Sequence, residues 1–256
     1  MRQADELREL VEAYLRTLSL SSDLGGLEDA LRYSLEAGGK RIRPVICLAV
    51  TEAAGGEPEK SLPAAAALEL VHTFSLVHDD LPALDDDAER RGRPSAHVAF
   101  GEGVALLAGD ALLVEALRLA LSYDDPGIAR ELTDSTLRMI GGQYRDITGD
   151  DADLQALHRL KTGALFEASV GLGLRVAGAP VGQLAPWRSF GSELGLLFQV
   201  VDDILDGDGY VARLGEEAAR GIASRAAGRA RAALDEVPGD TSVLRDLVDT
   251  LARRTG

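Results

Sequence analysis

The sequence predicts an all-α fold, with a single domain that spans residues 1–256. Leu and Ala are the most frequent residues and aromatic residues make up only 4% of the chain, a composition that favours helices. Apolar residues also recur at helical spacing along almost the whole chain. Strand patterns joined by hairpin turns are absent from the sequence, and no composition shift or internal repeat marks a domain boundary.

The helices can be placed in order from their apolar stripes and from the residues that end each stripe. The first covers residues 7–18 and ends before Ser21-Ser22-Asp23, which can also cap the next helix. The second covers residues 27–35 and stops at the glycine pair 38–39. The third runs from about residue 44 to 53, and a loop containing Gly and Pro follows it. The remaining helices are expected over residues 62–80, 103–121, 127–147, 153–177, 183–206, 210–236 and 242–254, which gives roughly ten in all.

The overall charge and the terminal residues limit the classes of function. The net charge of −15 argues against a nucleic-acid partner, because proteins that bind nucleic acids usually present a basic surface. Cys47 lies in an apolar run, so we expect a packed thiol and no disulfide within the chain. The first residues lack the apolar stretch of a signal peptide, and the most apolar window, residues 104–121, carries Asp110, Glu115 and Arg118. We therefore expect a soluble, cytoplasmic protein that does not span a membrane.

Two acidic segments, each at the end of a long apolar helix, stand out from this background. They are residues 78–87 (HDDLPALDDD) and residues 198–206 (FQVVDDILD). Asp202 and Asp206 are four residues apart and therefore share a helix face. Asp79 and Asp85 are six apart, and Pro82 between them is expected to break the helix so that Asp85 turns back toward Asp79.

The density of carboxylates in these segments predicts a metal site. Two carboxylates about 4 Å apart repel each other by on the order of 4 kcal/mol at an intermediate dielectric. A divalent cation relieves this repulsion, and oxygen ligands favour Mg²⁺, which binds a few carboxylates together with substrate phosphates. Two such segments therefore indicate a site that binds a diphosphate through Mg²⁺. From the residues alone, the alternative that each segment is a solvated helix end stays open.

Two basic segments provide partners for phosphate groups. Residues 38–44 (GGKRIRP) place three cations beside a glycine pair, and residues 90–94 (RRGRP) closely follow the first acidic segment. Arg and Lys side chains, together with helix N-termini, bind phosphate oxygens. Residues 161–163 (KTG) are a weaker signal of the same kind. Ordinary surface charge is the alternative for each segment.

In this order, the segments resemble the motifs of the trans-isoprenyl diphosphate synthase (polyprenyl synthetase) family. The matching segments are residues 38–44, 69–97, 107–113, 141–146, 161–163 and 198–206. Residues 69–97 resemble the first aspartate-rich motif of bacterial short-chain members, which make farnesyl or geranylgeranyl diphosphate, and residues 198–206 resemble the second. The resemblance covers most of the chain and implies an isoprenoid-synthase-type helical bundle around a central cavity.

The resemblance also implies roles for individual residues. The residues expected to bind Mg²⁺, at about three ions per active site, are Asp79, Asp80, Asp85, Asp202 and Asp206. Those expected to help the metal ions hold the allylic diphosphate are Arg90, Lys161 and Gln199. Those expected to hold the diphosphate of isopentenyl diphosphate, without metal, are Lys40, Arg43, His72 and Arg91. The expected catalytic residues are Lys161, Thr162 and Gln199, of which the last two would stabilise the allylic cation through their oxygens.

The implied reaction condenses isopentenyl diphosphate with dimethylallyl or geranyl diphosphate. In the family, the residues four and five positions before the first aspartate, here Ser75 and Phe74, line the floor of the tail pocket. The bulk of Phe74 favours the C15 product farnesyl diphosphate, with the C20 product geranylgeranyl diphosphate as the alternative. Ordinary core packing is the other reading of Phe74. A homodimer is expected from the resemblance, with the apolar helix at residues 104–121 as its candidate interface.

The sequence departs from the family after the second acidic segment. Members usually carry a Gly- and Lys-rich loop there that contacts the diphosphate, whereas here Asp206-Gly207-Asp208-Gly209 leads directly to Tyr210. The stretch at residues 148–152 also looks short. This departure keeps a catalytically weak partner subunit of a prenyl synthase as an alternative function.

Two other classes of helical protein share part of this pattern. A terpene cyclase uses the same metal and diphosphate chemistry but needs no isopentenyl site, so the two basic segments and His72 argue against it. A di-iron bundle is suggested by Glu69 and His72, three residues apart, but it requires a second Glu-x-x-His motif, which the sequence lacks.

Overall fold

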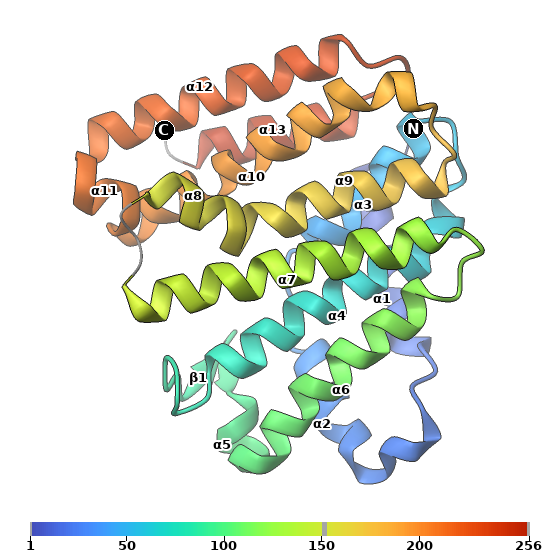
Figure 1. Cartoon of the computed structure of the whole chain (residues 1–256), viewed down its shortest axis with the longest axis vertical. Helices are drawn as coiled ribbons and strands as arrows, with labels where there is room; N and C mark the ends of the chain where they lie inside the picture. Colours follow the sequence, from blue (N-terminus) through green and yellow to red (C-terminus); the bar gives the residue numbers. More distant parts are fainter. Residues whose placement is uncertain (1, 150–152, 255–256) are drawn as a thin grey trace.

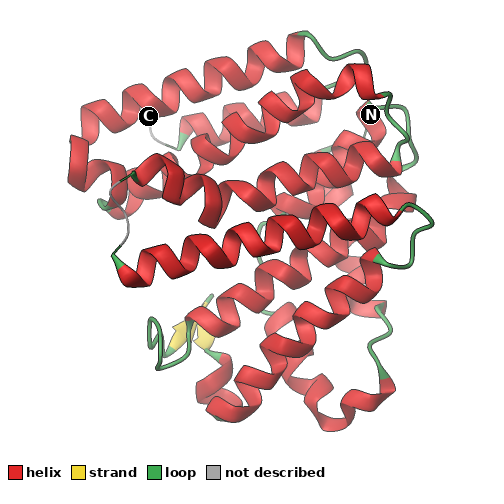
Figure 2. Cartoon of the chain, in the orientation of Figure 1, coloured by secondary structure: helices red, strands yellow, loops and turns green. Residues whose placement is uncertain are grey.

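The structure, a computed structural model, describes residues 2–149 and 153–254, and helices dominate it (Figure 1, Figure 2). The predicted all-α fold is therefore confirmed. The α-helices are α1 (Ala4–Thr17), α2 (Glu28–Leu35), α3 (Ile42–Ala53), α4 (Leu62–Asp79), α5 (Ala96–Phe100), α6 (Glu102–Ala120), α7 (Pro126–Thr148), α8 (Leu154–His158), α9 (Ala164–Val176), α10 (Leu184–Asp206), α11 (Gly209–Leu214), α12 (Glu216–Asp235) and α13 (Ser242–Arg253). The shorter elements are the 3₁₀ turns η1 (Ser22–Leu27), η2 (Pro58–Ser61) and η4 (Val181–Gln183), the π-helical turn η3 (Arg159–Gly163), and strands β1 (Glu89–Arg90) and β2 (Arg93–Pro94).

The helices pack around α3, α4 and α9. In Figure 1, α10, α12 and α13 lie on one side of this centre, and α2 and α6 lie on the other. The α10 helix packs on α12, α4 packs on α6, and α9 packs on α3, α7 and α10. Most residues of α3 and α9 are buried on every face, which is typical of a helix at the centre of a bundle. Within residues 2–149 and 153–254, no helix combines the length and the apolar character needed to cross a bilayer.

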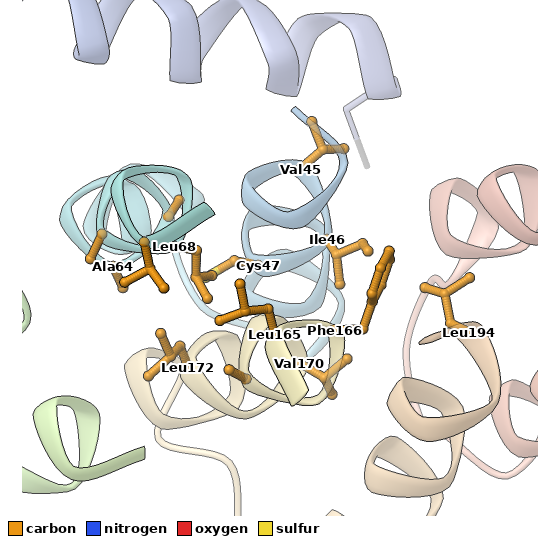
Figure 3. Packing of buried hydrophobic residues seen from close by; sticks show 14 of the residues in the cluster. Val45, Ile46, Cys47, Ala64, Leu68, Leu165, Phe166, Val170, Leu172 and Leu194 are labelled. Carbon is orange, nitrogen blue, oxygen red and sulfur yellow. The ribbon is translucent and has the colours of Figure 1, made fainter. Parts of the chain in front are cut away.

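The contact between α3 and α9 is close enough to require glycine. Figure 3 shows side chains of α3, α4 and α9 directed toward one another, with Cys47 near the centre. A Cβ on Gly173 would lie 2.6 Å from the carbonyl oxygen of Cys47. The absence of a side chain at this position therefore sets the distance between the two helices. Cys47 is buried, as predicted, and burial raises the pKa of its thiol to about 12.

Three local features differ from the sequence-based predictions. The predicted helix 153–177 is interrupted by η3, and the predicted helix 210–236 is two helices, because Gly215 adopts a left-handed φ of 83° between α11 and α12. Strands β1 and β2 form an antiparallel hairpin that the sequence pattern did not reveal, since each strand has only two residues. Residues 150–152, part of the stretch predicted to be short, lie outside the described residues.

A buried ion pair ties the loop before α3 to the middle of α4. Arg41 adopts a left-handed φ of 48°, and its guanidinium donates to Glu69 Oε1 and to Glu12 Oε1 (2.7 Å). The side chains of Arg41 and Glu69 are only 1% and 2% exposed. The carboxylate of Glu69 is thereby committed to a structural ion pair, which leaves it unsuited to the di-iron role considered above.

Replacing Arg41 tests this pair. Arg41→Met should lower the free energy of unfolding by about 3–5 kcal/mol, because it leaves the Glu69 carboxylate buried without a cation. Urea denaturation followed by circular dichroism measures this difference.

The control is Arg220→Met, which removes an exposed pair with Glu216 and should change stability by less than about 1 kcal/mol. The double variant Arg41→Met/Glu69→Leu should be more stable than Arg41→Met alone, because no unpaired charge is left buried. A double variant as unstable as the single one would contradict the structural role of the pair.

Candidate active site

A cavity of about 440 Å³ lies between α4, α7, α9 and α10. The first acidic segment reaches it from the end of α4, and the second reaches it from the last turns of α10. Most of the remaining wall is apolar, with Met139, Leu165 and Phe198 among its residues. The cavity therefore combines a carboxylate-bearing rim with an apolar interior.

Asp79 lies at the C-terminal end of α4, where the helix stops ahead of Pro82. The backbone N–H of Asp85 donates to the carbonyl oxygen of Asp79 (2.9 Å), so the chain does turn back as predicted. Gln143 of α7 donates through Nε2 to Asp79 Oδ1 (2.9 Å). Burial raises the pKa of Asp79 to about 6, and the neighbouring Asp85 and Asp80 raise it further while Lys161 lowers it. The carboxylate is therefore costly to ionise without a cation.

Asp202 lines the same cavity from α10. Burial raises its pKa, whereas Arg254, whose Nη1 lies 3.8 Å from Asp202 Oδ1, lowers it together with Lys40. Asp79 and Asp202 are 123 residues apart in the sequence (202 minus 79), and the fold brings both to one cavity.

The other three predicted metal ligands do not line this cavity. Asp85 and Asp206 are exposed nearby. Asp80, which follows the last residue of α4, is buried outside the cavity lining, and its Oδ1 accepts a hydrogen bond from Nε of Arg90 (2.8 Å). Arg90 also pairs with Asp87 (2.7 Å), so this predicted phosphate ligand is occupied by two carboxylates in the structure.

The donor set suits Mg²⁺ better than a metal held by protein alone. Within the two described ranges, no group of three or more His, Cys, Asp and Glu side chains is arranged to hold a metal ion. Mg²⁺ commonly binds one or two carboxylates and completes its coordination with water and substrate phosphates. Carboxylate oxygens from Asp79 and Asp202, which line one cavity from two different helices, fit that mode.

A second cavity, of about 350 Å³, is lined by cationic side chains. It contains all four residues predicted to hold the diphosphate of isopentenyl diphosphate, namely Lys40, Arg43, His72 and Arg91. Arg91 reaches it from the turn of the β1–β2 hairpin, and its guanidinium donates to the carbonyl of Gly38. A Cβ on Gly39 would lie 2.9 Å from Arg91 Nη1, so the glycine pair makes room for this arginine.

Arg43, His72 and Phe198 line both cavities and form the wall between them. The guanidinium of Arg43 lies 4.9 Å from the ring centroid of Phe166, and its desolvation lowers its pKa to about 10. Burial also lowers the pKa of His72 well below its usual value, and the surrounding arginines lower it further. At neutral pH, His72 is therefore a neutral imidazole among cations.

The π-helical turn η3 presents Lys161 and Thr162 of the KTG segment to the first cavity. Lys161 Nζ donates to Asp146 Oδ2 (2.5 Å) and Thr162 Oγ1 donates to Gln199 Oε1 (2.5 Å). A Cβ on Gly142 would lie 2.4 Å from the backbone nitrogen of Lys161, so α7 and η3 touch through backbone. π-Helical turns are frequent at functional sites because they shift side chains relative to a regular helix.

Phe74 and Ser75 both line the first cavity. The ring of Phe74 meets the imidazole of His78 edge-on, with 5.0 Å between centroids, and Ser75 Oγ donates to the carbonyl of His72 (2.8 Å). His78 in turn lies 3.0 Å from the carbonyl oxygen of Leu106 on α6. These contacts fix the side chains that α4 contributes to the cavity wall.

Sequence reasoning assigned no role to several residues that the structure places at the cavity. Residues 139, 140, 143, 144 and 147 form one wall, and their spacing is that of a single helix face. This stripe on the predicted helix 127–147 was the available signal. Gln143, which binds Asp79, and Asp146, which binds Lys161, lie on or beside it.

Comparison with known proteins identifies the family. The polyprenyl synthetase family model matches residues 25–227. The farnesyl diphosphate synthase of Geobacillus stearothermophilus is 40% identical over 228 residues, which cover 83% of this chain and 77% of that protein. The geranylgeranyl diphosphate synthase of Cyanophora paradoxa is 42% identical over 218 residues, which cover 78% of this chain and 72% of that protein.

Solved structures agree with the sequence relatives. A structure described as a geranyltranstransferase from Thermotoga maritima superposes with a TM-score of 0.85 at 29% identity, covering 98% of both chains. A putative farnesyl-diphosphate synthase from a Marinomonas species superposes with a TM-score of 0.84 at 35% identity, covering 97% of both chains. By its fold, its paired acidic motifs and these matches, the chain belongs to the polyprenyl synthetase family.

Proposed function

We propose that the chain is a Mg²⁺-dependent trans-prenyltransferase that condenses isopentenyl diphosphate with dimethylallyl or geranyl diphosphate. One observation carries the proposal: an apolar cavity with a carboxylate rim adjoins a cavity lined by cations, and the two share a wall. A reaction that joins two diphosphate substrates needs two anion sites beside one space for hydrocarbon. The names of the sequence relatives support the same reaction class.

The first cavity is the proposed allylic site. Asp79 and Asp202 would hold Mg²⁺, with Asp85 and Asp206 close by and exposed for further coordination through water. Mg²⁺ bound there would offset the negative charge that develops on the departing diphosphate. Lys161 would contribute a cation from η3, and Asp80 would act by holding Arg90 at the edge of the site.

The second cavity is the proposed isopentenyl site. Its cations bind a diphosphate without metal, because the guanidinium forks of Arg43 and Arg91 match phosphate oxygens. The neutral His72 donates a hydrogen bond without adding a further buried charge. Phe198 in the shared wall offers the hydrocarbon part an apolar contact.

The proposed chemistry breaks one bond and forms another. The allylic C–O bond breaks with both electrons leaving on the diphosphate, and an allylic cation remains. The isopentenyl double bond then supplies the electron pair for the new C–C bond, and the departed diphosphate removes the proton from the adjacent carbon. Oxygens of Thr162 and Gln199 face the cavity and would stabilise the cation, while the two cavities align the substrates.

A C15 product is the proposed outcome, with C20 as the alternative. The relatives include synthases of both product lengths, so only the shape of this cavity distinguishes the two products. The ring of Phe74 stands in the apolar wall and is held there by its contact with His78. It limits the depth of the cavity that is available to a growing prenyl chain.

The cytoplasmic location and the number of Mg²⁺ ions expected from the sequence stay predictions.

A homodimer through α6 and α7 is part of the proposal. The α6 helix exposes Val104, Leu106, Leu107 and Val114, and the neighbouring α7 exposes Leu137, Ile140, Tyr144 and Ile147. Exposed apolar side chains gathered on two adjacent helices are typical of an interface. Three of the α7 residues also line the first cavity, so a second copy would cover its open side.

The activity can be tested directly. Purified protein with Mg²⁺, isopentenyl diphosphate and dimethylallyl diphosphate should form farnesyl diphosphate, and a chelator should abolish the reaction. Asp79→Asn and Asp202→Asn should each lower kcat on the order of 10²-fold. Asp134→Asn, on the exposed face of α7, is the matched control. If no product forms with any allylic primer up to C15, the proposed enzymatic activity is contradicted and the role of a partner subunit is favoured.

The wall at Phe74 can be tested by product analysis. Phe74→Ala should shift the product toward C20, because removing the ring deepens the cavity. Chromatography of the dephosphorylated products by chain length measures the shift. Phe100→Ala, which removes a ring outside the cavity, should leave the distribution unchanged. If the products of Phe74→Ala match those of the unaltered chain, Phe74 does not set the length.

The proposed dimer interface can be tested by introducing a charged side chain into it. Val114→Glu, at a position that is 64% exposed in one copy, should convert the dimer to a monomer because a carboxylate would be buried between copies. Size-exclusion chromatography with light scattering measures the mass. Val181→Glu, at an 84% exposed position on η4, should remain dimeric. A Val114→Glu dimer would place the interface elsewhere.

A further inference from the structure

A chain of hydrogen bonds leads from the short turn after α10 into the first cavity. The backbone N–H of Tyr210 donates to Asp203 Oδ2 (2.9 Å), and Gln199 Nε2 donates to Asp203 Oδ1 (2.7 Å). The hydroxyl of Thr162 then donates to Gln199 Oε1 (2.5 Å). Asp203 is 3% exposed and does not line the cavity, whereas Gln199 and Thr162 do. The series of hydrogen bonds therefore ends on the cavity surface that would face the allylic group.

The direction of every bond in this chain is fixed by chemistry. A carboxylate has only acceptors, so the amide of Gln199 must turn its NH₂ group toward Asp203. Its oxygen is then turned toward Thr162 and must accept the hydroxyl hydrogen. The hydrogen of Thr162 is thereby committed to Gln199, and the oxygen keeps free lone pairs.

This use of a helix hydroxyl differs from that of its neighbours. Thr133 and Thr136 on α7 and Ser169 on α9 each donate to the backbone carbonyl four residues earlier. Thr162 lies in the π-helical turn and donates to a side chain of a different helix. Its orientation is therefore determined by Gln199 and, through Gln199, by Asp203.

We propose that Asp203 is a positioning residue for prenyl transfer, which acts through Gln199 to keep the Thr162 oxygen, and not its hydrogen, directed at the allylic cation. The inference rests on the proposed function and deepens it. An oxygen lone pair stabilises positive charge, whereas a hydroxyl hydrogen pointing at the same place would oppose it. Asp203 contacts neither substrate, and its effect passes entirely through the amide.

The short turn after α10 is built onto the same carboxylate. Gly209 has a left-handed φ of 44°, and a Cβ there would lie 2.1 Å from Asp203 Oδ2. The ring of His158 stacks on Tyr210 with 5.3 Å between centroids, and its Nε2 lies 3.7 Å from Asp203 Oδ2. The turn therefore holds Oδ2 in place and leaves only Oδ1 for Gln199.

Because of this arrangement, Asp203→Asn should reverse the donor and acceptor roles along the series of hydrogen bonds. The N–H of Tyr210 still requires an acceptor, so the amide oxygen of the new side chain must face it and the NH₂ group must face Gln199. Gln199 would then turn its oxygen toward residue 203 and its NH₂ group toward Thr162. The Thr162 oxygen would accept that bond, and its hydrogen would be released toward the cavity.

The expected result is a loss of kcat without a loss of substrate binding. Asp203→Asn should lower kcat on the order of 10²-fold, the effect typical of misdirecting one oriented dipole, with KM for both diphosphates unchanged within about twofold. Asp208→Asn neutralises an exposed carboxylate in the same turn and should keep the kcat of the unaltered chain. If kcat falls equally in the two variants, the effect is explained by the loss of a local negative charge, and the inference is overturned.

A double-mutant cycle separates positioning from general damage to the site. Thr162→Val removes the hydroxyl through which Asp203 acts, so the loss of kcat caused by Asp203→Asn should be much smaller in that background than in the unaltered chain, where Gln199 and Thr162 are both reoriented. Additive losses would show that Asp203 acts independently of Thr162 and would overturn the inference.

Gly209→Ala provides the same test without changing charge. Its Cβ would displace the Asp203 carboxylate from the side of the turn, so kcat should fall in the unaltered chain and should fall much less in the Thr162→Val background. This variant carries the test if circular dichroism shows that Asp203→Asn is unfolded. An unaltered chain without prenyltransferase activity would overturn the proposed function and this inference together, whereas an active chain with additive losses would overturn this inference alone.

Discussion

Negative charge collected at the C-terminal ends of two helices is the constraint on which the site depends. The last carbonyl groups of a helix carry partial negative charge, and carboxylates placed there add to it. Asp79 ends α4, and Asp202 lies in the last turns of α10. The apolar walls remove much of the water that would otherwise screen these charges, and burial accordingly raises the pKa of both groups. The cavity therefore favours a cation beside these carboxylates, because keeping them ionised without one costs free energy.

The bundle holds these helix ends in place through close backbone contacts. Gly173 brings α9 against α3, and Gly142 brings α7 against η3. Since a side chain at either position would meet backbone atoms, these distances are set by the main chain and not by adaptable side chains. The side chains of α7 and η3 that form hydrogen bonds at the cavity are therefore held in fixed positions. Fixed donors and acceptors of this kind are what electrostatic stabilisation of a reacting group requires.

The sequence was most informative where spacing alone determines geometry. Asp202 could be assigned to a helix face from the four-residue spacing, and Pro82 correctly predicted the turn after Asp79. Side-chain direction at a helix end could not be predicted in this way. Asp80 faces away from the cavity because Arg90, on a hairpin strand of only two residues, binds it there. Gly215 separates α11 from α12, although its surroundings have helical periodicity.

The two cavities also depend on each other electrically. Arg43 in their shared wall lies close enough to Asp202 for that carboxylate to raise its pKa, while burial and Arg91 lower it. Its charge therefore lies between the two sides, as a counterion to the acidic rim and as a proposed phosphate ligand in the basic cavity. His72 beside it is held neutral by burial and by the same arginines. A diphosphate entering the basic cavity would offset the repulsion among these cations, so binding there would change the electric field at the proposed allylic site. In the proposed reaction, the wall between the two cavities would thus both separate the substrates and couple their binding.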